Sequence, residues 1–176
     1  MNETAASWFA LRNGLTTIAS FVEAKHYWIY KGLAEWRVLN ATRVLREYKN
    51  GEGFLYLGRA YRLMLVRDQK EPLQIKNGRF TLRRDLVDTG EIEAARTAFR
   101  DFYTRKGLER LGARVDYYAP KVGVSPTGVD VKEIGFQWAA CTSAGKLTFH
   151  WKCVMAPLSI IDYVVVHELC HLHHRD

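Results

Sequence analysis

The chain has 176 residues, and its 26 lysines and arginines outnumber its 19 aspartates and glutamates, which gives a formal net charge of +7. Apolar residues make up 48% and charged residues 26%, a globular balance that excludes a disordered chain, a collagen-like repeat and a pure coiled coil. No apolar run approaches the roughly 18–20 residues that a membrane-spanning helix needs. We therefore expect one domain over residues 1–176, with a core of its own and no membrane span.

Compartment and thiol chemistry are predicted from the first residues and the cysteines. The sequence Met1-Asn2-Glu3-Thr4 lacks the basic and apolar stretches of a signal peptide, which favours a cytoplasmic location. Cys141, Cys153 and Cys170 form no CxxC pair, so reduced thiols are expected. Two alternatives are less favoured: a Cys141–Cys153 disulfide, and a structural zinc site of Cys141, His150 and Cys153, whose spacing matches no familiar zinc knuckle.

The first half of the chain predicts helices followed by strands. Apolar residues at three-to-four spacing over residues 16–48 predict one bent helix or two helices. After Gly53 the apolar positions alternate, which predicts either two strands joined around Gly58-Arg59 or one long bent strand. Residues 73–76 and 79–82 flank Asn77-Gly78, a dipeptide suited to a tight hairpin turn. These strands predict a small antiparallel sheet.

The second half predicts a helix and then short strands. Residues 91–111 predict a half-buried helix that Gly112 would end. Its apolar stripe comprises Ile92, Ala95, Phe99, Phe102 and Leu108. Strands are expected at residues 114–118, 131–138 and 146–155, with Pro157 ending the last. The predicted class is α+β.

The final segment, residues 160–172, predicts an amphipathic helix. Ser159 can cap it, Asp162 suits its first turn, and apolar residues at positions 160, 161, 164, 165, 169 and 172 would form the buried stripe. The β-branched residues 164–166 alone would favour a strand instead.

This segment contains His167-Glu168-Leu169-Cys170-His171, which has the H-E-x-x-H spacing. On a helix, His167 and His171 would project from one face, so that two imidazoles can converge on one metal ion with Glu168 beside them. In such sites a zinc ion lowers the pKa of bound water, and the glutamate takes the proton as attack on a carbonyl begins. The alternative is a pair of structural histidines, hydrogen-bonded in the core or on the surface.

Residues 135–141, 145–157 and 161–172 together resemble the YgjP-like metallopeptidase family, and more distantly the SprT-like and other zincin peptidases. The resemblance extends to residues 21–29 and 53–66, and so covers most of the chain. It implies a zincin-like α+β core with N-terminal helices, a small antiparallel sheet, a backing helix at about residues 91–111 and a C-terminal metal-binding helix.

The resemblance also implies a function. The chain would be a zinc-dependent metallopeptidase that acts on peptides or proteins, with His167 and His171 as zinc ligands and Glu168 as the catalytic base. An extended peptide would pair with the strand near residues 147–154.

Two departures from the family pattern affect these expectations. Residues 137–141 read Gln-Trp-Ala-Ala-Cys where the family usually has Arg-Trp-Gly-Ser-Cys. The family's third ligand would fall at position 177, just after Asp176, which implies a domain that lacks its C-terminal end. His174 could substitute as a ligand, His173 and His174 could form a solvent-exposed tail, or the chain could be a degenerate relative that binds no metal.

The basic charge allows one alternative function, a nucleic-acid-associated binding domain. Cations between residues 96 and 114 alternate with aromatic residues, and the two kinds together could bind phosphates and stack on bases. The cations are Arg96, Arg100, Arg105, Lys106, Arg110 and Arg114, and the aromatic residues are Phe99, Phe102, Tyr103, Tyr117 and Tyr118. We favour an amphipathic helix with core aromatics, because no recognised nucleic-acid module accompanies them. The sequence predicts neither the substrate nor the oligomeric state.

Overall fold

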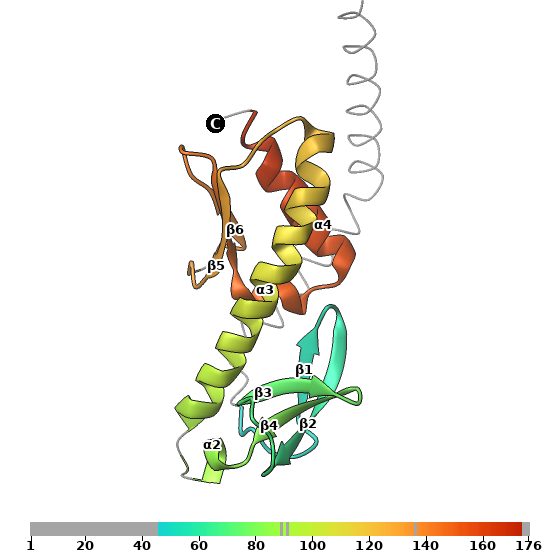
Figure 1. Cartoon of the computed structure of the whole chain (residues 1–176), viewed down its shortest axis with the longest axis vertical. Coiled ribbons are helices and arrows are strands. Elements are labelled where there is room, and N and C mark those ends of the chain that lie inside the picture. The colour runs from blue at the N-terminus through green and yellow to red at the C-terminus, as the bar shows by residue number, and fades with distance from the viewer. Residues whose placement is uncertain (1–45, 89, 91, 136, 174–176) are drawn as a thin grey trace, which may run out of the picture.

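The computed structural model describes residues 46–88, 90, 92–135 and 137–173 (Figure 1). A long helix, α3 (Ile92–Val122), runs through this part of the chain. One sheet lies beside its N-terminal half, while a second sheet and helix α4 (Leu158–Cys170) flank its C-terminal half (Figure 1). Most of the helix predicted over residues 16–48 lies outside the described residues, and residues 46–48 are not helical. In the described part, no helix is both long and apolar enough to cross a membrane.

The first sheet has the strand order β1-β2-β4-β3. Its strands are β1 (Gly53–Tyr56), β2 (Arg59–Val66), β3 (Leu73–Lys76) and β4 (Arg79–Arg83). The pairs β1–β2 and β3–β4 are antiparallel, which confirms both predicted strand pairs. The prediction of an antiparallel sheet is wrong, however, because β4 also pairs with β2 in parallel. The β3–β4 hairpin folds back so that its second strand lies between β2 and β3, an arrangement that no local turn signal encodes.

An aromatic core joins this sheet to the N-terminal half of α3. Phe80 on β4 is fully buried, and its ring lies 5.3 Å from the rings of Phe99 and Phe102 on the helix. Phe54 stacks on Phe99 with a centroid distance of 4.1 Å. The buried Tyr103 donates its hydroxyl hydrogen bond to the Leu55 carbonyl at 2.8 Å. These contacts set the position of the sheet along α3.

Helix α3 is longer than predicted. It continues through Gly112 and includes residues 114–118, for which a strand is the sequence prediction. The helix continues because its buried stripe continues through Leu111, Val115, Ala119 and Val122. It ends at Gly123, whose φ of 80° turns the chain so that the next N–H, that of Val124, also bonds to the Ala119 carbonyl, at 3.0 Å. Two residues of the expected stripe, Ile92 and Leu108, are 45% and 49% exposed.

The second sheet has the order β5-β7-β6, with β5 and β7 parallel and β6 and β7 antiparallel. Its strands are β5 (Gly128–Lys132), β6 (Ala139–Cys141) and β7 (Lys146–His150). The strand predicted over residues 131–138 is therefore wrong except at its first two positions. The strand predicted over residues 146–155 ends at His150, because Trp151–Met155 forms a 3₁₀-helix, η1. The α+β class is confirmed, with a short helix, α2 (Asp85–Asp88), before α3.

The turn between β1 and β2 fixes the start of α4. The N–H groups of Leu57 and Gly58 bond to the carbonyls of Val154 and Met155 in η1, at 2.8 and 3.0 Å. Gly58 has a φ of 76°, and a Cβ there would lie 2.9 Å from Cα of Pro157. Pro157 precedes the helix, so Ser159 lies inside the first turn rather than at the predicted cap position.

Candidate metal centre

Helix α4 buries one face in the core, which explains why the β-branched residues 164–166 lie in a helix and not in a strand. The buried residues are Ile160, Ile161, Val164, Val165, Glu168 and Leu169. Their three-to-four spacing matches the predicted stripe, and α4 packs along α3 and against β6. Burial of this stripe outweighs the weak preference of valine for strands.

An ion pair between helices fixes α4 against α3. The guanidinium of Arg114 on α3 donates two hydrogen bonds to the Asp162 carboxylate, at 2.5 and 2.6 Å. The Tyr118 hydroxyl donates to the same carboxylate at 3.2 Å. Donating these hydrogen bonds to the Asp162 carboxylate raises the pKa of Arg114. The predicted place of Asp162 in the first turn is wrong, because α4 begins at Leu158 and has no acidic residue in that turn. The sequence does not reveal the partners of Asp162, since they lie 48 and 44 positions away and no spacing rule joins them.

His167 and His171 meet on the exposed side of α4. Their Nε2 atoms lie 3.2 Å apart, and His171 is the C-terminal cap of the helix. The ring of Tyr163, one turn earlier, stacks on His167 with a centroid distance of 5.9 Å and an interplanar angle of 22°. The structure therefore brings the two predicted ligands together, and Tyr163 is a neighbour that the motif alone does not reveal.

Glu168 joins the pair from the buried side. It is only 7% exposed, and the ligand atoms of His167, Glu168 and His171 all lie within 4.8 Å of one another. Burial raises the pKa of Glu168, with an opposing contribution from His171. Partial burial, together with the neighbouring His171, lowers the pKa of His167 and so favours the neutral imidazole that binds metals.

The spacing of these donors fits a zinc ion. Two nitrogens bound to one tetrahedral zinc at about 2.0–2.1 Å lie about 3.3–3.4 Å apart. The 3.2 Å between the two Nε2 atoms is close to this value, so little side-chain movement is needed to bind a metal. Among the described residues, these three form the one group of histidine, cysteine, aspartate or glutamate side chains that could hold a metal ion.

The other candidate ligands have different environments. His173 is exposed, as the solvent-exposed tail predicts, and its Nε2 hydrogen-bonds to the Val122 carbonyl at 2.8 Å. His174 lies outside the described residues. The three residues of the alternative zinc site form no metal-binding group, because Cys153 donates to the Trp138 carbonyl and His150 pairs with Glu133. None of the three cysteines forms a disulfide.

The structure also tests the proposed stacking surface on α3. Phe99, Phe102 and Tyr103 lie in the core and cannot stack on bases. Arg114 is engaged with Asp162, whereas Tyr117 is 51% exposed. The burial of Phe99, Phe102 and Tyr103 therefore agrees with the interpretation of an amphipathic helix with core aromatics.

A helix that presents two histidines one turn apart beside a buried glutamate has the site architecture of the H-E-x-x-H metallohydrolases. The model of the family described as "YgjP-like, metallopeptidase domain" matches residues 11–176, and the chain belongs to this family. The resemblance noted from the sequence is thus confirmed over essentially the whole chain. No curated protein and no solved structure matches the sequence. Family membership supports a metal-dependent peptidase activity in general.

Proposed function

We propose that this protein is a zinc-dependent peptidase whose catalytic group is Glu168 and whose metal ligands include His167 and His171. The observation that carries the proposal is the 3.2 Å approach of the two Nε2 atoms beside a carboxylate that is 7% exposed. Catalytic zinc usually takes three protein ligands, and the family resemblance places the third directly after Asp176. A cytoplasmic location accompanies this proposal, supported by three cysteines that form no disulfide.

Each residue has a distinct role in the proposed hydrolysis. When bound, zinc supplies a Lewis acid that activates water and the scissile carbonyl. Neutral His167 and His171 leave the positive charge of the ion intact. The Glu168 carboxylate accepts a proton from the attacking water and delivers it to the departing amine. Its raised pKa makes it a stronger base than an exposed glutamate, which suits this transfer.

The structure changes where a peptide substrate would pair. The expectation for residues 147–154 is wrong, because β7 is paired on both sides and continues into η1. Of the two outer strands of this sheet, β6 contacts α4. We propose that an extended peptide or protein segment aligns along β6 and places its scissile bond over the two histidines.

Zinc content per chain tests the metal site. We expect about one zinc per chain in the parent protein and none in His167→Ala, measured by elemental analysis after gentle purification. The matched control is His173→Ala, which removes a nearby histidine that bonds to Val122 and should keep the metal. Equal zinc content in the two variants would contradict the assignment of His167.

Activity tests the base. We expect Glu168→Gln to retain zinc and to lose roughly 10²–10⁴-fold in cleavage of a quenched-fluorescent peptide library. Glu109→Gln, on the exposed side of α3 and paired with Lys106, should cleave at the parental rate. If Glu168→Gln binds zinc and still cleaves at the parental rate, Glu168 is not the catalytic base.

A further inference from the structure

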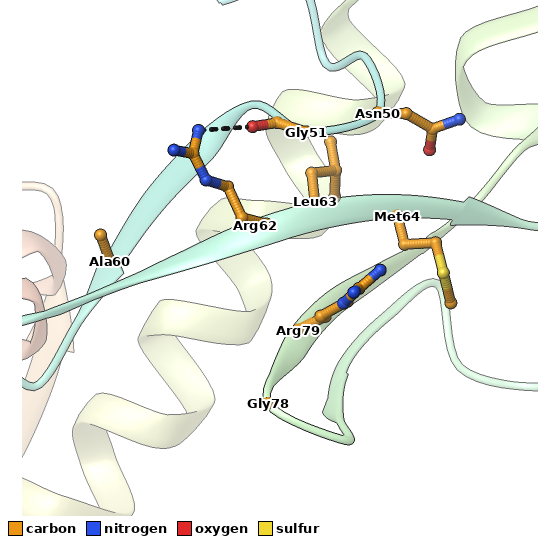
Figure 2. A pocket seen from close by; sticks show the side chains of 8 residues that line it. All are labelled: Asn50, Gly51, Ala60, Arg62, Leu63, Met64, Gly78 and Arg79. Carbon is orange, nitrogen blue, oxygen red and sulfur yellow. Dashed lines mark hydrogen bonds between the residues drawn. The ribbon is translucent and has the colours of Figure 1, made fainter.

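The first sheet carries a hollow on the face that points away from α3. The hollow has a volume of about 560 Å³ and opens between β2 and the β3–β4 turn (Figure 2). Its lining comprises Asn50, Gly51, Ala60, Arg62, Leu63, Met64, Gly78 and Arg79, which we call the arginine pocket. The first sheet, which carries the pocket, lies beside the N-terminal half of α3 and away from the C-terminal end of α4 (Figure 1).

The pairing register of the strands places three cations side by side at this pocket. Arg62 on β2 is the direct partner of Arg79 on β4, and Arg79 is the direct partner of Lys76 on β3. Paired residues in a sheet project from the same face, about 4.8 Å apart per strand. All three residues are exposed, whereas Phe80, the next residue of β4, points into the core. Three positive charges therefore stand in one row across three strands.

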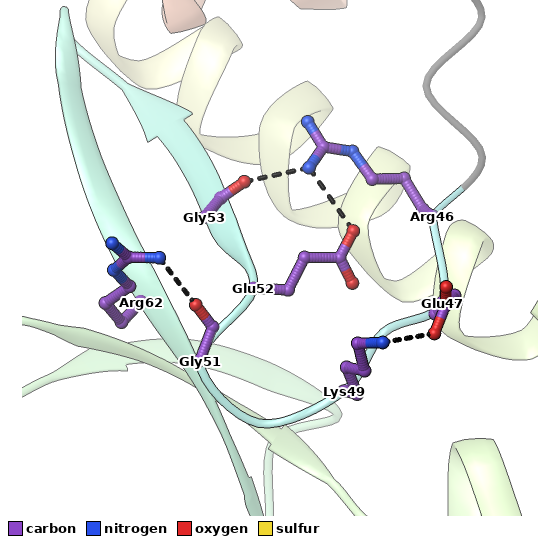
Figure 3. Close-up of polar contacts among 7 residues, drawn as sticks. All are labelled: Arg46, Glu47, Lys49, Gly51, Glu52, Gly53 and Arg62. Carbon is purple, nitrogen blue, oxygen red and sulfur yellow. Dashed lines mark hydrogen bonds and ion pairs between the residues drawn. The ribbon is translucent and has the colours of Figure 1, made fainter.

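Among the described residues, no carboxylate pairs with the charges of this row. No residue that lines the pocket is acidic. The Arg62 side chain donates one hydrogen bond to the Gly51 carbonyl at 2.8 Å, and the Arg79 side chain has no hydrogen bond or ion pair with any described residue. Figure 3 shows that the carboxylates of the adjoining loop are engaged elsewhere, Glu52 with Arg46 and Glu47 with Lys49. Like charges directly opposite each other destabilise a sheet, and a bound anion would remove that repulsion.

The donors favour one kind of anion. Each guanidinium presents a planar fork of N–H groups that matches phosphate or carboxylate oxygens two at a time. A carboxylate has one negative charge and two oxygens, which match one fork, whereas a phosphate dianion has two negative charges and more acceptor oxygens, so that it can bridge two forks and an ammonium. Gly51, Ala60 and Gly78 contribute little or no side chain, which leaves room between the arginines. We propose that the arginine pocket binds a phosphate group, held by Arg62 and Arg79 with Lys76 beside them.

Calorimetric titration of the full chain with inorganic phosphate at fixed ionic strength tests this proposal. We expect saturable binding that weakens at least roughly tenfold in Arg79→Gln, since a charge-assisted bidentate contact is lost. Arg79→Lys keeps the charge but not the fork and should be weakened to a similar degree. The matched control is Arg100→Gln, which removes an exposed arginine from α3 and should bind within about twofold of the parent. Circular dichroism checks that each variant is folded.

The further arms identify the source of the phosphate and limit the proposal. The second probe is a single strand of twelve deoxythymidine nucleotides. If this strand binds more tightly than phosphate, and its affinity falls in Arg79→Gln as the affinity for phosphate does, the site is supported and its ligand is a phosphodiester backbone. Preference for inorganic phosphate over the strand would support it as a site for phosphate monoesters. The proposal is overturned if succinate binds as well as phosphate, if Arg100→Gln and Arg79→Gln lose equal affinity, or if no saturable binding occurs.

Discussion

At the scale of single residues, His150 is the clearest case of a titratable side chain whose environment dictates its protonation state. The ring is 3% exposed, and its Nδ1 accepts a hydrogen bond from the Lys152 N–H at 3.0 Å. Nε2 therefore carries the proton and donates to Glu133 at 2.6 Å. Burial lowers the pKa of His150, Glu133 opposes this effect, and Lys152 adds to it. A neutral His150 thus caps η1 and fixes the end of β7.

This environment predicts a loss of stability in mild acid. The pKa of His150 is lower in the folded than in the unfolded state, so its contribution is complete above about pH 6.5 and is lost as the pH falls through the folded pKa. We expect the urea midpoint of the parent to fall between pH 7.5 and pH 5.5 by more than that of His150→Asn, which keeps an acceptor but cannot titrate. His173→Asn is the control and should behave as the parent does. An equal fall in His150→Asn and the parent would contradict the prediction.

At the scale of elements, the Arg114–Asp162 pair couples the two long helices. The side chains are 33% and 22% exposed, so the two charges are partly shielded from solvent and are worth more than a surface ion pair. We expect Asp162→Asn to lower the free energy of unfolding by about 1–2 kcal/mol, measured by urea denaturation. Glu93→Gln breaks the exposed Arg96–Glu93 pair and should cost less than about 0.5 kcal/mol. Equal costs for the two variants would mean that the pair does not fix α4.

The elements also differ in how far the sequence predicts them. Both strand pairs of the first sheet follow from alternation and from Asn77-Gly78, because hairpin geometry is set by adjacent residues. The parallel β2–β4 contact does not follow, since it joins strands through long-range packing. Gly112 illustrates the limit of local signals. The prediction that Gly112 ends the helix is wrong, because the buried stripe continues past it and the helix ends at Gly123.

In the candidate metal centre too, the sequence predicts one feature and leaves others unpredicted. The His167–His171 convergence follows from helical spacing alone, and the structure confirms it. The surroundings of the pair do not follow: burial of Glu168 and the ion pair at Asp162 depend on which surfaces α3 and β6 present to α4. Spacing within one helix is a local property, whereas the environment of the pair is a tertiary one.

At the scale of the whole molecule, α3 belongs to both halves of the described structure and should make them unfold together. Its N-terminal half holds Phe99 and Phe102 against Phe80, and its C-terminal half holds Arg114 against α4. We expect Phe80→Ala to cost about 3–5 kcal/mol and to speed amide exchange in α4 as well as in β4, measured by hydrogen–deuterium exchange. Met64→Ala, on the exposed face of the same sheet, should change neither element by more than about 1 kcal/mol. Faster exchange confined to the first sheet would show that α3 does not couple the halves. Faster exchange in both would mean that the aromatic core, far from α4 in the sequence, helps to keep the two histidines in place.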